Sequence, residues 1–247
     1  MKKRQSLWVW GAFFVFVVGC EVVDFGYFGE IGPTAWSELM ADYVACGDGT
    51  EQSPVNITTA DVQVDGALPV VQTNYETVDA VLINNGHTLE VEYAEGSTLT
   101  FGNKTYELVQ FHFHTLSEHR VDGAPADMEA HLVHRNDAGE LLVLGILIHV
   151  GAENAFLAQF WNEFSLSEST TETDIEINVT DLLPADLDYY TYSGSLTTPP
   201  CTEIVTWVVL KTPIALSREQ VDFFTYRVGN NARPMQELNG RTVLSPN

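Results

Sequence analysis

Gln110-Phe111-His112-Phe113-His114 is the stretch of sequence that decides the fold. Side chains two residues apart in a β-strand project from the same face. His112 and His114 therefore point together, and Phe111 and Phe113 point to the other side. The phenylalanines indicate a buried strand, and two buried imidazoles need polar partners, which a metal ion supplies. The stretch predicts a metal-binding strand, and two histidines on a polar sheet face are the alternative.

The next strand-like segment, Glu129-Ala130-His131-Leu132-Val133-His134, offers a third imidazole. Glu129, His131 and Val133 share one face of such a strand. The chain between His114 and His131 is long enough to return as an adjacent antiparallel strand, which sets His131 opposite the pair. Three neutral imidazoles leave a zinc ion with one open position, as in catalytic zinc sites that activate water.

Short runs with strand character dominate the rest of the chain, and turn signals separate them. The clearest strands are expected at Thr88–Tyr93, Phe111–Thr115, Leu141–Val150, Ile175–Val179 and Ile204–Leu210. Helices are expected at Ala155–Phe164 and at Arg218–Tyr226, the second with Ser217 as N-cap. This pattern predicts one β-rich α+β domain with a few short surface helices.

The first 20 residues are expected to be a signal peptide that precedes a single domain at 21–247. A basic start is followed by the apolar run Leu7–Val18, which is shorter than the roughly 20 residues that span a bilayer. The run ends in Val17-Val18-Gly19-Cys20, which resembles the site where bacterial lipoproteins are lipidated on cysteine. We expect export to the periplasm or cell surface with a lipid anchor on Cys20. An ordinary secretion signal is the alternative.

Cys46 and Cys201 are the two other cysteines of the chain. An exported protein meets an oxidising compartment, so these two cysteines suggest one disulfide. Two buried free thiols are the alternative.

The formal net charge of −23 excludes some partners. A field of that sign disfavours nucleic acid and anionic lipid headgroups. The acidic residues are dispersed along the chain, so they indicate a solvated surface. A second interpretation is adaptation to salt, which screens the repulsion among them.

Two families carry a similar histidine pair. His112, His114 and Glu118 resemble the first motif of the cupin barrels, but the Pro-x-Gly that precedes the second cupin motif is missing before His131 and His134. The α-class carbonic anhydrases fit better, because several linked motifs occur in order from Gly26 to Arg241. These are Gln52–Ile57, Asn84–His87, Gln110–His114, Ser117–His119, Glu129–His134 and Ser195–Pro200.

The resemblance implies a large, mostly antiparallel twisted central β-sheet and a role for each matching residue. His112, His114 and His131 are the implied zinc ligands, and Gln110 and Glu129 are the implied partners of their imidazoles. Thr197 would accept the proton of zinc-bound hydroxide and donate its own to Glu118. The residues that would order active-site water are Tyr27, Asn85 and Thr198. The apolar wall that would hold CO₂ comprises Val133, Val143, Leu196, Val205 and Trp207.

The other histidines and the pocket edge complete these expectations. His87 is the implied shuttle that relays the proton to buffer, because a histidine titrates near neutral pH. His119 is expected to hydrogen-bond within the scaffold, with Tyr192 as the candidate partner. His134 is expected to point away from the metal, and His149 to be exposed. Cys46 and Cys201 fall where exported bacterial members of the family place a disulfide. Glu90 stands where relatives often carry a neutral residue, so it should weaken anionic inhibitors.

The sequence therefore predicts a zinc enzyme that reversibly hydrates CO₂ to bicarbonate and a proton. Sulfonamides and anions are the expected inhibitors. A homodimer is expected because exported bacterial relatives are often dimers. A non-catalytic binding protein on the same fold is the competing class, but such relatives typically lose a ligand histidine. An esterase is a further alternative, because the same zinc hydroxide can attack activated esters. No Gly-x-Ser-x-Gly elbow of serine esterases occurs, so esterase activity is expected to be secondary at most.

Overall fold

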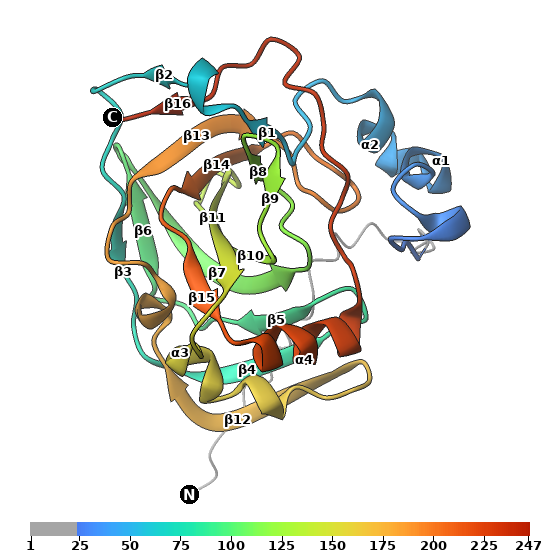
Figure 1. Cartoon of the computed structure of the whole chain (residues 1–247), viewed down its shortest axis with the longest axis vertical. Helices are drawn as coiled ribbons and strands as arrows, with labels where there is room; N and C mark the ends of the chain where they lie inside the picture. The colour runs from blue at the N-terminus through green and yellow to red at the C-terminus, as the bar shows by residue number, and fades with distance from the viewer. Residues whose placement is uncertain (1–23) are drawn as a thin grey trace, which may run out of the picture.

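The computed structural model describes residues 24–247 (Figure 1). The expected signal peptide and Cys20 lie outside the described residues. Within residues 24–247, none of the helices has the length and apolar character needed to cross a membrane.

Strands are the commonest regular elements of the described chain, and its helices are short. The strands are β1 (Asn56–Ile57), β2 (Gln63–Val64), β3 (Gln72–Asn74), β4 (Val78–Asn84), β5 (Leu89–Glu92), β6 (Thr98–Phe101), β7 (Lys104–His114), β8 (Arg120–Val121), β9 (Ala124–Pro125), β10 (Met128–Arg135), β11 (Leu141–Val150), β12 (Ser169–Ile177), β13 (Tyr189–Gly194), β14 (Val205–Leu210), β15 (Ile214–Leu216) and β16 (Leu244–Ser245). The α-helices are α1 (Trp36–Leu39), α2 (Ala45–Asp48), α3 (Ala155–Ala158) and α4 (Arg218–Val228). The 3₁₀ turns are η1 (Gly29–Ile31), η2 (Ala41–Tyr43), η3 (Thr59–Asp61), η4 (Trp161–Glu163) and η5 (Val179–Leu182).

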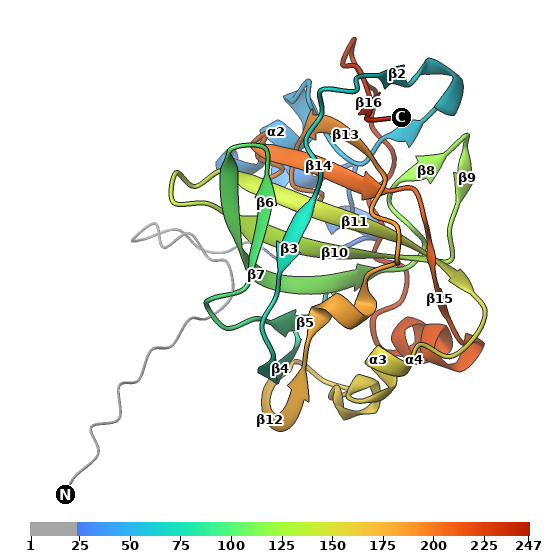
Figure 2. The ribbon, with the colours of Figure 1, turned by 90° about the vertical axis from the view of Figure 1, so that its left-hand side faces the viewer.

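One large twisted sheet organises the described residues. Its main path runs β12-β4-β5-β7-β10-β11-β14-β13-β16-β2, and β3, β6 and β15 attach beside it. Figure 2 shows β14, β11, β10 and β7 side by side in its centre. Most pairs are antiparallel; β11 with β14, β11 with β15 and β16 with β2 are parallel. The mostly antiparallel central sheet that the resemblance implies is confirmed.

The two faces of the central strands carry different side chains. Phe111 and Phe113 lie in the larger apolar cluster, together with alternate residues of β10, β11 and β14. The helices α3 and α4 cover that face, where Trp161 Nε1 donates to the carbonyl of Gln220. The opposite face of the same strands carries His112, His131 and a second apolar cluster around Trp207. Period-two alternation thus separates the main core from the candidate site.

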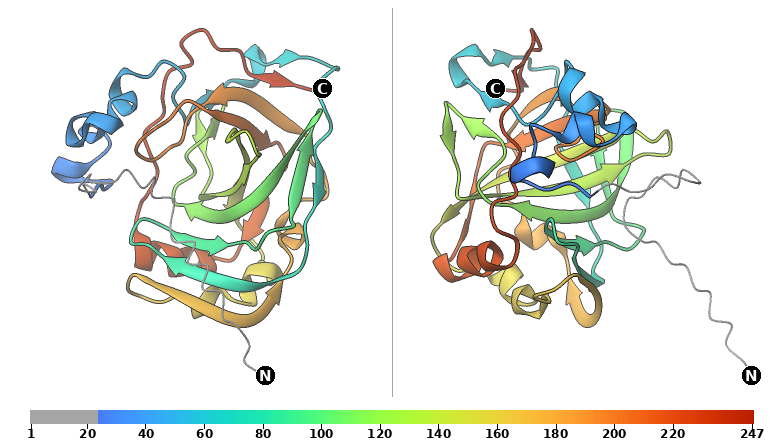
Figure 3. Two further views of the ribbon diagram at one scale, coloured as in Figure 1. Left: turned by 180° about the vertical axis from the view of Figure 1, so that it is seen from behind. Right: turned by 90° about the vertical axis from the view of Figure 1, so that its right-hand side faces the viewer.

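The chain after α4 runs back along the molecule, past α1 and α2, to β16 (Figures 1 and 3). Arg233 in this segment donates from Nη2 to the carbonyl of Cys46, 3.0 Å away. This return path brings residues near 231 and 233 beside strands that come early in the sequence.

Most predicted elements agree with the structure, but the strand expected at Ile175–Val179 ends at Ile177, where β12 ends and η5 soon begins, and one helix is wrong. Leu141–Val150 is β11 with the expected bounds, and α4 begins after Ser217, which makes a capping box with Gln220. The continuous helix expected at 155–164 is wrong, because Phe160 leaves helical geometry (φ −138°, ψ −5°) between α3 and η4. The side chains of Phe160 and Trp161, which lie at this break, are each 1% exposed. Tertiary packing of the two rings therefore overrides the local helical pattern.

Candidate metal centre and active site

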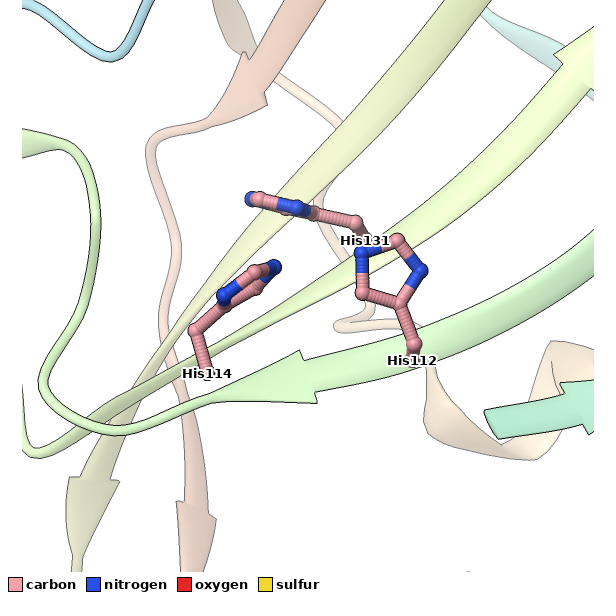
Figure 4. A group of neighbouring side chains, drawn as sticks. All are labelled: His112, His114 and His131. Atoms are coloured by element: carbon pink, nitrogen blue, oxygen red, sulfur yellow. The ribbon is translucent and has the colours of Figure 1, made fainter. Parts of the chain in front are cut away.

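Antiparallel pairing of β7 with β10 brings three imidazoles together. His112 lies directly opposite His131 in this pairing, and His114 follows two residues further along β7 on the same face. The ring centroids are 5.0 Å apart for His112 and His114, 5.3 Å for His112 and His131, and 4.6 Å for His114 and His131. One nitrogen from each ring lies within 4.8 Å of the others. Figure 4 shows the three rings gathered around a common point.

Each of the three rings uses one nitrogen to donate a hydrogen bond. His112 Nδ1 donates to Gln110 Oε1 at 2.8 Å, and His114 Nδ1 donates to the Asn231 carbonyl at 2.9 Å. His131 Nε2 donates to Glu129 Oε1 at 2.8 Å. These bonds fix the neutral tautomers, so the second nitrogen of each ring carries a lone pair. Such partners orient ligand imidazoles in metal sites.

Burial disfavours the charged forms of His112 and His114 and leaves two polar atoms of the cluster without hydrogen-bond partners. His114 and His131 are each 1% exposed. Burial, and after it the neighbouring imidazoles, lowers the pKa of His112 well below its usual range, and burial lowers the pKa of His114. His114 Nε2 and Glu118 Oε2 are buried without a hydrogen-bond partner. Three imidazoles, one of them with an unpaired buried nitrogen, fit a zinc ion in type and number.

A second cluster of possible ligands, His119, Glu129 and His131, is an internal hydrogen-bond network. Glu129 Oε1 accepts from His119 Nδ1 at 2.7 Å as well as from His131, and Oε2 accepts from the backbone N–H of His119. Burial alone would raise the pKa of Glu129, but His119 and His131 hold it well below its usual range. His119 Nε2 lies 2.6 Å from the Tyr192 hydroxyl, so the expected scaffold contact is confirmed.

Gly145 makes room for this network. It lies opposite His131 in the β10–β11 pairing. A Cβ at Gly145 would lie 3.1 Å from Glu129 Oε1, tighter than an ordinary contact. Sequence reasoning missed this residue, although a glycine inside an apolar strand is a signal of close approach.

Glu118 lies beside the free ring nitrogens. Its Oε1 accepts from the backbone N–H of Arg233 at 2.8 Å. Its Oε2 lies 3.6 Å from His114 Nε2 and 3.9 Å from His131 Nδ1. The implied Thr197–Glu118 hydrogen bond is not formed through this oxygen. Oε2 is unpartnered and faces the imidazoles. Thr197 itself is 6% exposed, and Thr198 beside it is half-buried.

The residues of the implied CO₂ wall come together on the histidine face. The second apolar cluster contains them, with Leu196 packed against the rest: Val133, Val143, Leu196, Val205 and Trp207. Trp207 also packs edge-on to His131, with centroids 4.8 Å apart. The position next to the imidazoles is therefore walled on one side by apolar side chains.

The rim of the site is formed by the turn before β5 and by the first described residues. Asn85 Oδ1 accepts from the backbone N–H groups of His87 and Thr88, so this oxygen serves the turn. His87 stacks on Phe25 with centroids 4.2 Å apart, and its Nε2 lies 3.6 Å from Asp24 Oδ1.

Two more side chains near the rim are affected by burial. Burial, and then the charge of Glu118, raises the pKa of Tyr27 well above its usual range, so its phenol keeps its proton. Glu90 lies opposite His112 in the β5–β7 pairing. Burial, with a smaller effect of Glu92, raises the pKa of Glu90 to about 7.

The two remaining histidines lie apart from this centre, as expected. His134 is buried on the other face, where its Nε2 lies 2.8 Å from the Tyr75 hydroxyl, and burial lowers its pKa to about 4. The His149 side chain is 56% exposed and lies 3.7 Å from Asp127.

Cys46 and Cys201 form the expected disulfide. It joins α2 to the loop of Thr197 and Thr198, since the Cys201 N–H donates to the Thr198 carbonyl. The predicted bond is confirmed, and it suits an oxidising compartment.

Sequence reasoning also missed Asn231 and Arg233. Both lie on the return segment after α4, and each bonds a residue of the centre: Asn231 bonds His114, and Arg233 bonds Glu118. Their contacts span more than a hundred residues of sequence, so no local pattern could reveal them.

Comparison with known proteins assigns this arrangement to a family. The model of the eukaryotic-type carbonic anhydrase family matches residues 31–247. Carbonic anhydrases from Nostoc sp. and Neisseria gonorrhoeae are 44% and 42% identical, over 91% and 89% of this chain and 86% of each relative. The solved complex of the Thermovibrio ammonificans α-carbonic anhydrase with sulfanilamide is 41% identical, with a TM-score of 0.87 over 90% of this chain and 99% of that one.

Proposed function

The chain belongs to the eukaryotic-type, or α, carbonic anhydrases, and we propose that it hydrates CO₂ to bicarbonate and a proton at a zinc ion held by His112, His114 and His131. The observation that carries this proposal is that the two nitrogens of each imidazole have different surroundings. One nitrogen donates to Gln110, Asn231 or Glu129, and the other faces the shared centre. Held this way, the rings are oriented before any ligand arrives.

Zinc bound there supplies a Lewis acid that lowers the pKa of water to near 7, an effect for which carbonic anhydrase is itself the standard example. The residues of the chain hold and orient the reactants. Gln110 and Glu129 keep His112 and His131 in the ligating tautomers, and the negative charge of Glu129 increases the basicity of His131.

Thr197 and Glu118 would orient the reacting water. Glu118 is held by Arg233, and its unpartnered Oε2 is the acceptor that the Thr197 hydroxyl needs. When Thr197 donates there, its oxygen can only accept from the water. That leaves a lone pair of the water directed at CO₂.

The apolar wall around Trp207 would hold the substrate. CO₂ has no net charge or strong hydrogen-bonding group, so a surface of Val133, Val143 and Trp207 suits it. Weak apolar holding also favours release of the charged product, bicarbonate.

His87 would carry the proton to buffer. Its side chain is 30% exposed at the rim, and Phe25 stacks on its ring. A partly exposed imidazole can receive a proton from ordered water and release it to solvent. Tyr27, Asn85 and Thr198 are the proposed groups that order this water.

Stopped-flow CO₂ hydration at several buffer concentrations tests the proposal. We expect rapid hydration by the wild type. In weak buffer, turnover of His87→Ala should fall by up to about 10²-fold, and added imidazole should restore it. His149→Ala, which removes an exposed histidine away from the centre, is the control and should behave as wild type. A wild type without hydration activity would overturn the function, and turnover of His87→Ala equal to wild type in weak buffer would overturn the shuttle.

We also propose that the chain is exported as a lipoprotein with residues 1–20 as signal peptide and Cys20 lipidated, leaving 21–247 as the domain. The Cys46–Cys201 disulfide supports an oxidising destination. Intact-mass measurement of membrane-extracted protein tests this, and a free Cys20 thiol would contradict it.

We further propose that sulfonamides and anions inhibit the enzyme and that it forms a homodimer. Inhibition by sulfanilamide tests the first point, and equilibrium sedimentation tests the second.

A further inference from the structure

Asn231 is a fully buried side chain that bonds three backbone groups in two separate segments of the protein. Its Nδ2 donates to the His87 carbonyl at 2.9 Å and to the Phe113 carbonyl at 3.0 Å. Its Oδ1 accepts from the backbone N–H of Thr115 at 2.8 Å. Both amide hydrogens and the oxygen are therefore used, as a buried amide requires.

The backbone of Asn231 bonds the same region. Its carbonyl accepts from His114 Nδ1 at 2.9 Å, and its N–H donates to the Thr115 carbonyl at 3.0 Å. One residue thus grips the end of β7 at His114 and Thr115 and also holds the turn that carries His87.

The β5–β7 ladder does not itself reach His87. The pairing of β5 with β7 begins at Glu90 opposite His112. Before it, Thr88 Oγ1 donates to the Phe113 carbonyl at 2.6 Å. The bond from Asn231 to the His87 carbonyl extends the attachment by one more residue, to the His87 backbone itself.

We propose that Asn231 is a positioning residue for proton transfer, whose side-chain amide holds His87 at a fixed place relative to the metal ligand His114. This inference rests on the proposed function, in which His87 carries the proton. Proton transfer through ordered water depends steeply on the positions of donor and acceptor. Asn231 contacts neither substrate nor proton in this account, and it acts through the His87 backbone.

Asn231→Asp is the test variant, because it keeps Oδ1 and the side-chain shape but replaces the donor Nδ2. Asn178→Asp is the matched control. Asn178 Nδ2 donates to the Tyr75 carbonyl and its Oδ1 accepts from the Thr180 N–H, away from the metal centre. Both variants lose an amide donor to a backbone carbonyl.

We expect kcat for CO₂ hydration in weak buffer to fall about 10-fold in Asn231→Asp, while kcat/KM changes about twofold or less. Asn178→Asp should leave both unchanged. In a His87→Ala background, Asn231→Asp should lower kcat no further, because its effect passes through His87. In the zinc-free protein, backbone amides of residues 85–88 should exchange with solvent about 10-fold faster in Asn231→Asp only.

A measurement on the wild type covers the case in which Asn231→Asp does not fold. The Asn231 side-chain N–H groups should exchange far more slowly than those of the exposed Asn239, which reaches only the Thr50 carbonyl. Equal exchange for the two, or a parallel fall of kcat and kcat/KM that persists in the His87→Ala background, would overturn the role of Asn231. If instead His87→Ala itself has no effect in weak buffer, the shuttle of the proposed function has failed.

Discussion

Removal of the Cys46–Cys201 disulfide should destabilise the fold by several kcal/mol. The bond joins residues 155 positions apart, so it closes most of the described chain into one loop. On the chain-entropy model, a loop of this length costs the unfolded state about 5 kcal/mol. Measured losses on removal of a disulfide are often smaller than this value, typically about 2–5 kcal/mol.

The expected net loss for Cys46→Ala/Cys201→Ala is therefore about 3–5 kcal/mol. For a domain of this size, each kcal/mol lowers Tm by about 2–4 °C, so Tm should fall by about 6–20 °C. Thermal melting of the double variant and the wild type, each with and without reductant, measures this. Reductant should lower Tm of the wild type and leave the variant unchanged. A double variant that melts within about 2 °C of wild type would refute the loop-closure reasoning.

Three further predictions follow from the site and the surface charge. Gln110→Ala should weaken zinc binding about 10- to 100-fold by freeing the His112 ring, which competition with a chelator measures; unchanged affinity would contradict that contact. Burial raises the pKa of Glu90 in the folded state to about 7, so the contribution of Glu90 to the free energy of unfolding is complete below pH 4.5 and is lost as pH rises through 7. The free energy of unfolding in urea should therefore be equal for Glu90→Gln and wild type near pH 4, and about 1–3 kcal/mol higher for Glu90→Gln above pH 8. A difference that does not change with pH would refute the burial effect. The net charge of −23 predicts that Tm rises between 0.05 and about 1 M NaCl as repulsion is screened, and a flat or falling Tm would argue against strong self-repulsion.

Local periodicity was sufficient to predict the cluster of His112, His114 and His131. Alternation along β7 predicts that His112 and His114 share a face, and the apolar run Leu141–Val150 predicts the buried strand β11. The position of His131 also follows, since an antiparallel return is the simplest path after His114. These inferences need only the geometry of strands and short connections.

The rest of the site depends on contacts between distant segments. Asn231 and Arg233 reach His114 and Glu118 because the chain returns past the first strands after α4. No periodic pattern encodes such a path. The break at Phe160 has the same origin, because the packing of buried rings there determines the backbone, and the sequence alone fits a continuous helix equally well.

Zinc binding by the wild type and by His131→Ala tests the central claim most directly. His134→Ala is the matched control, since it removes a buried histidine from the opposite face of the same strand. We expect one zinc per chain in wild type and in folded His134→Ala, with CO₂ hydration in both, and loss of both zinc and activity in folded His131→Ala. A His131→Ala variant that retains stoichiometric zinc and wild-type hydration would contradict the three-histidine site.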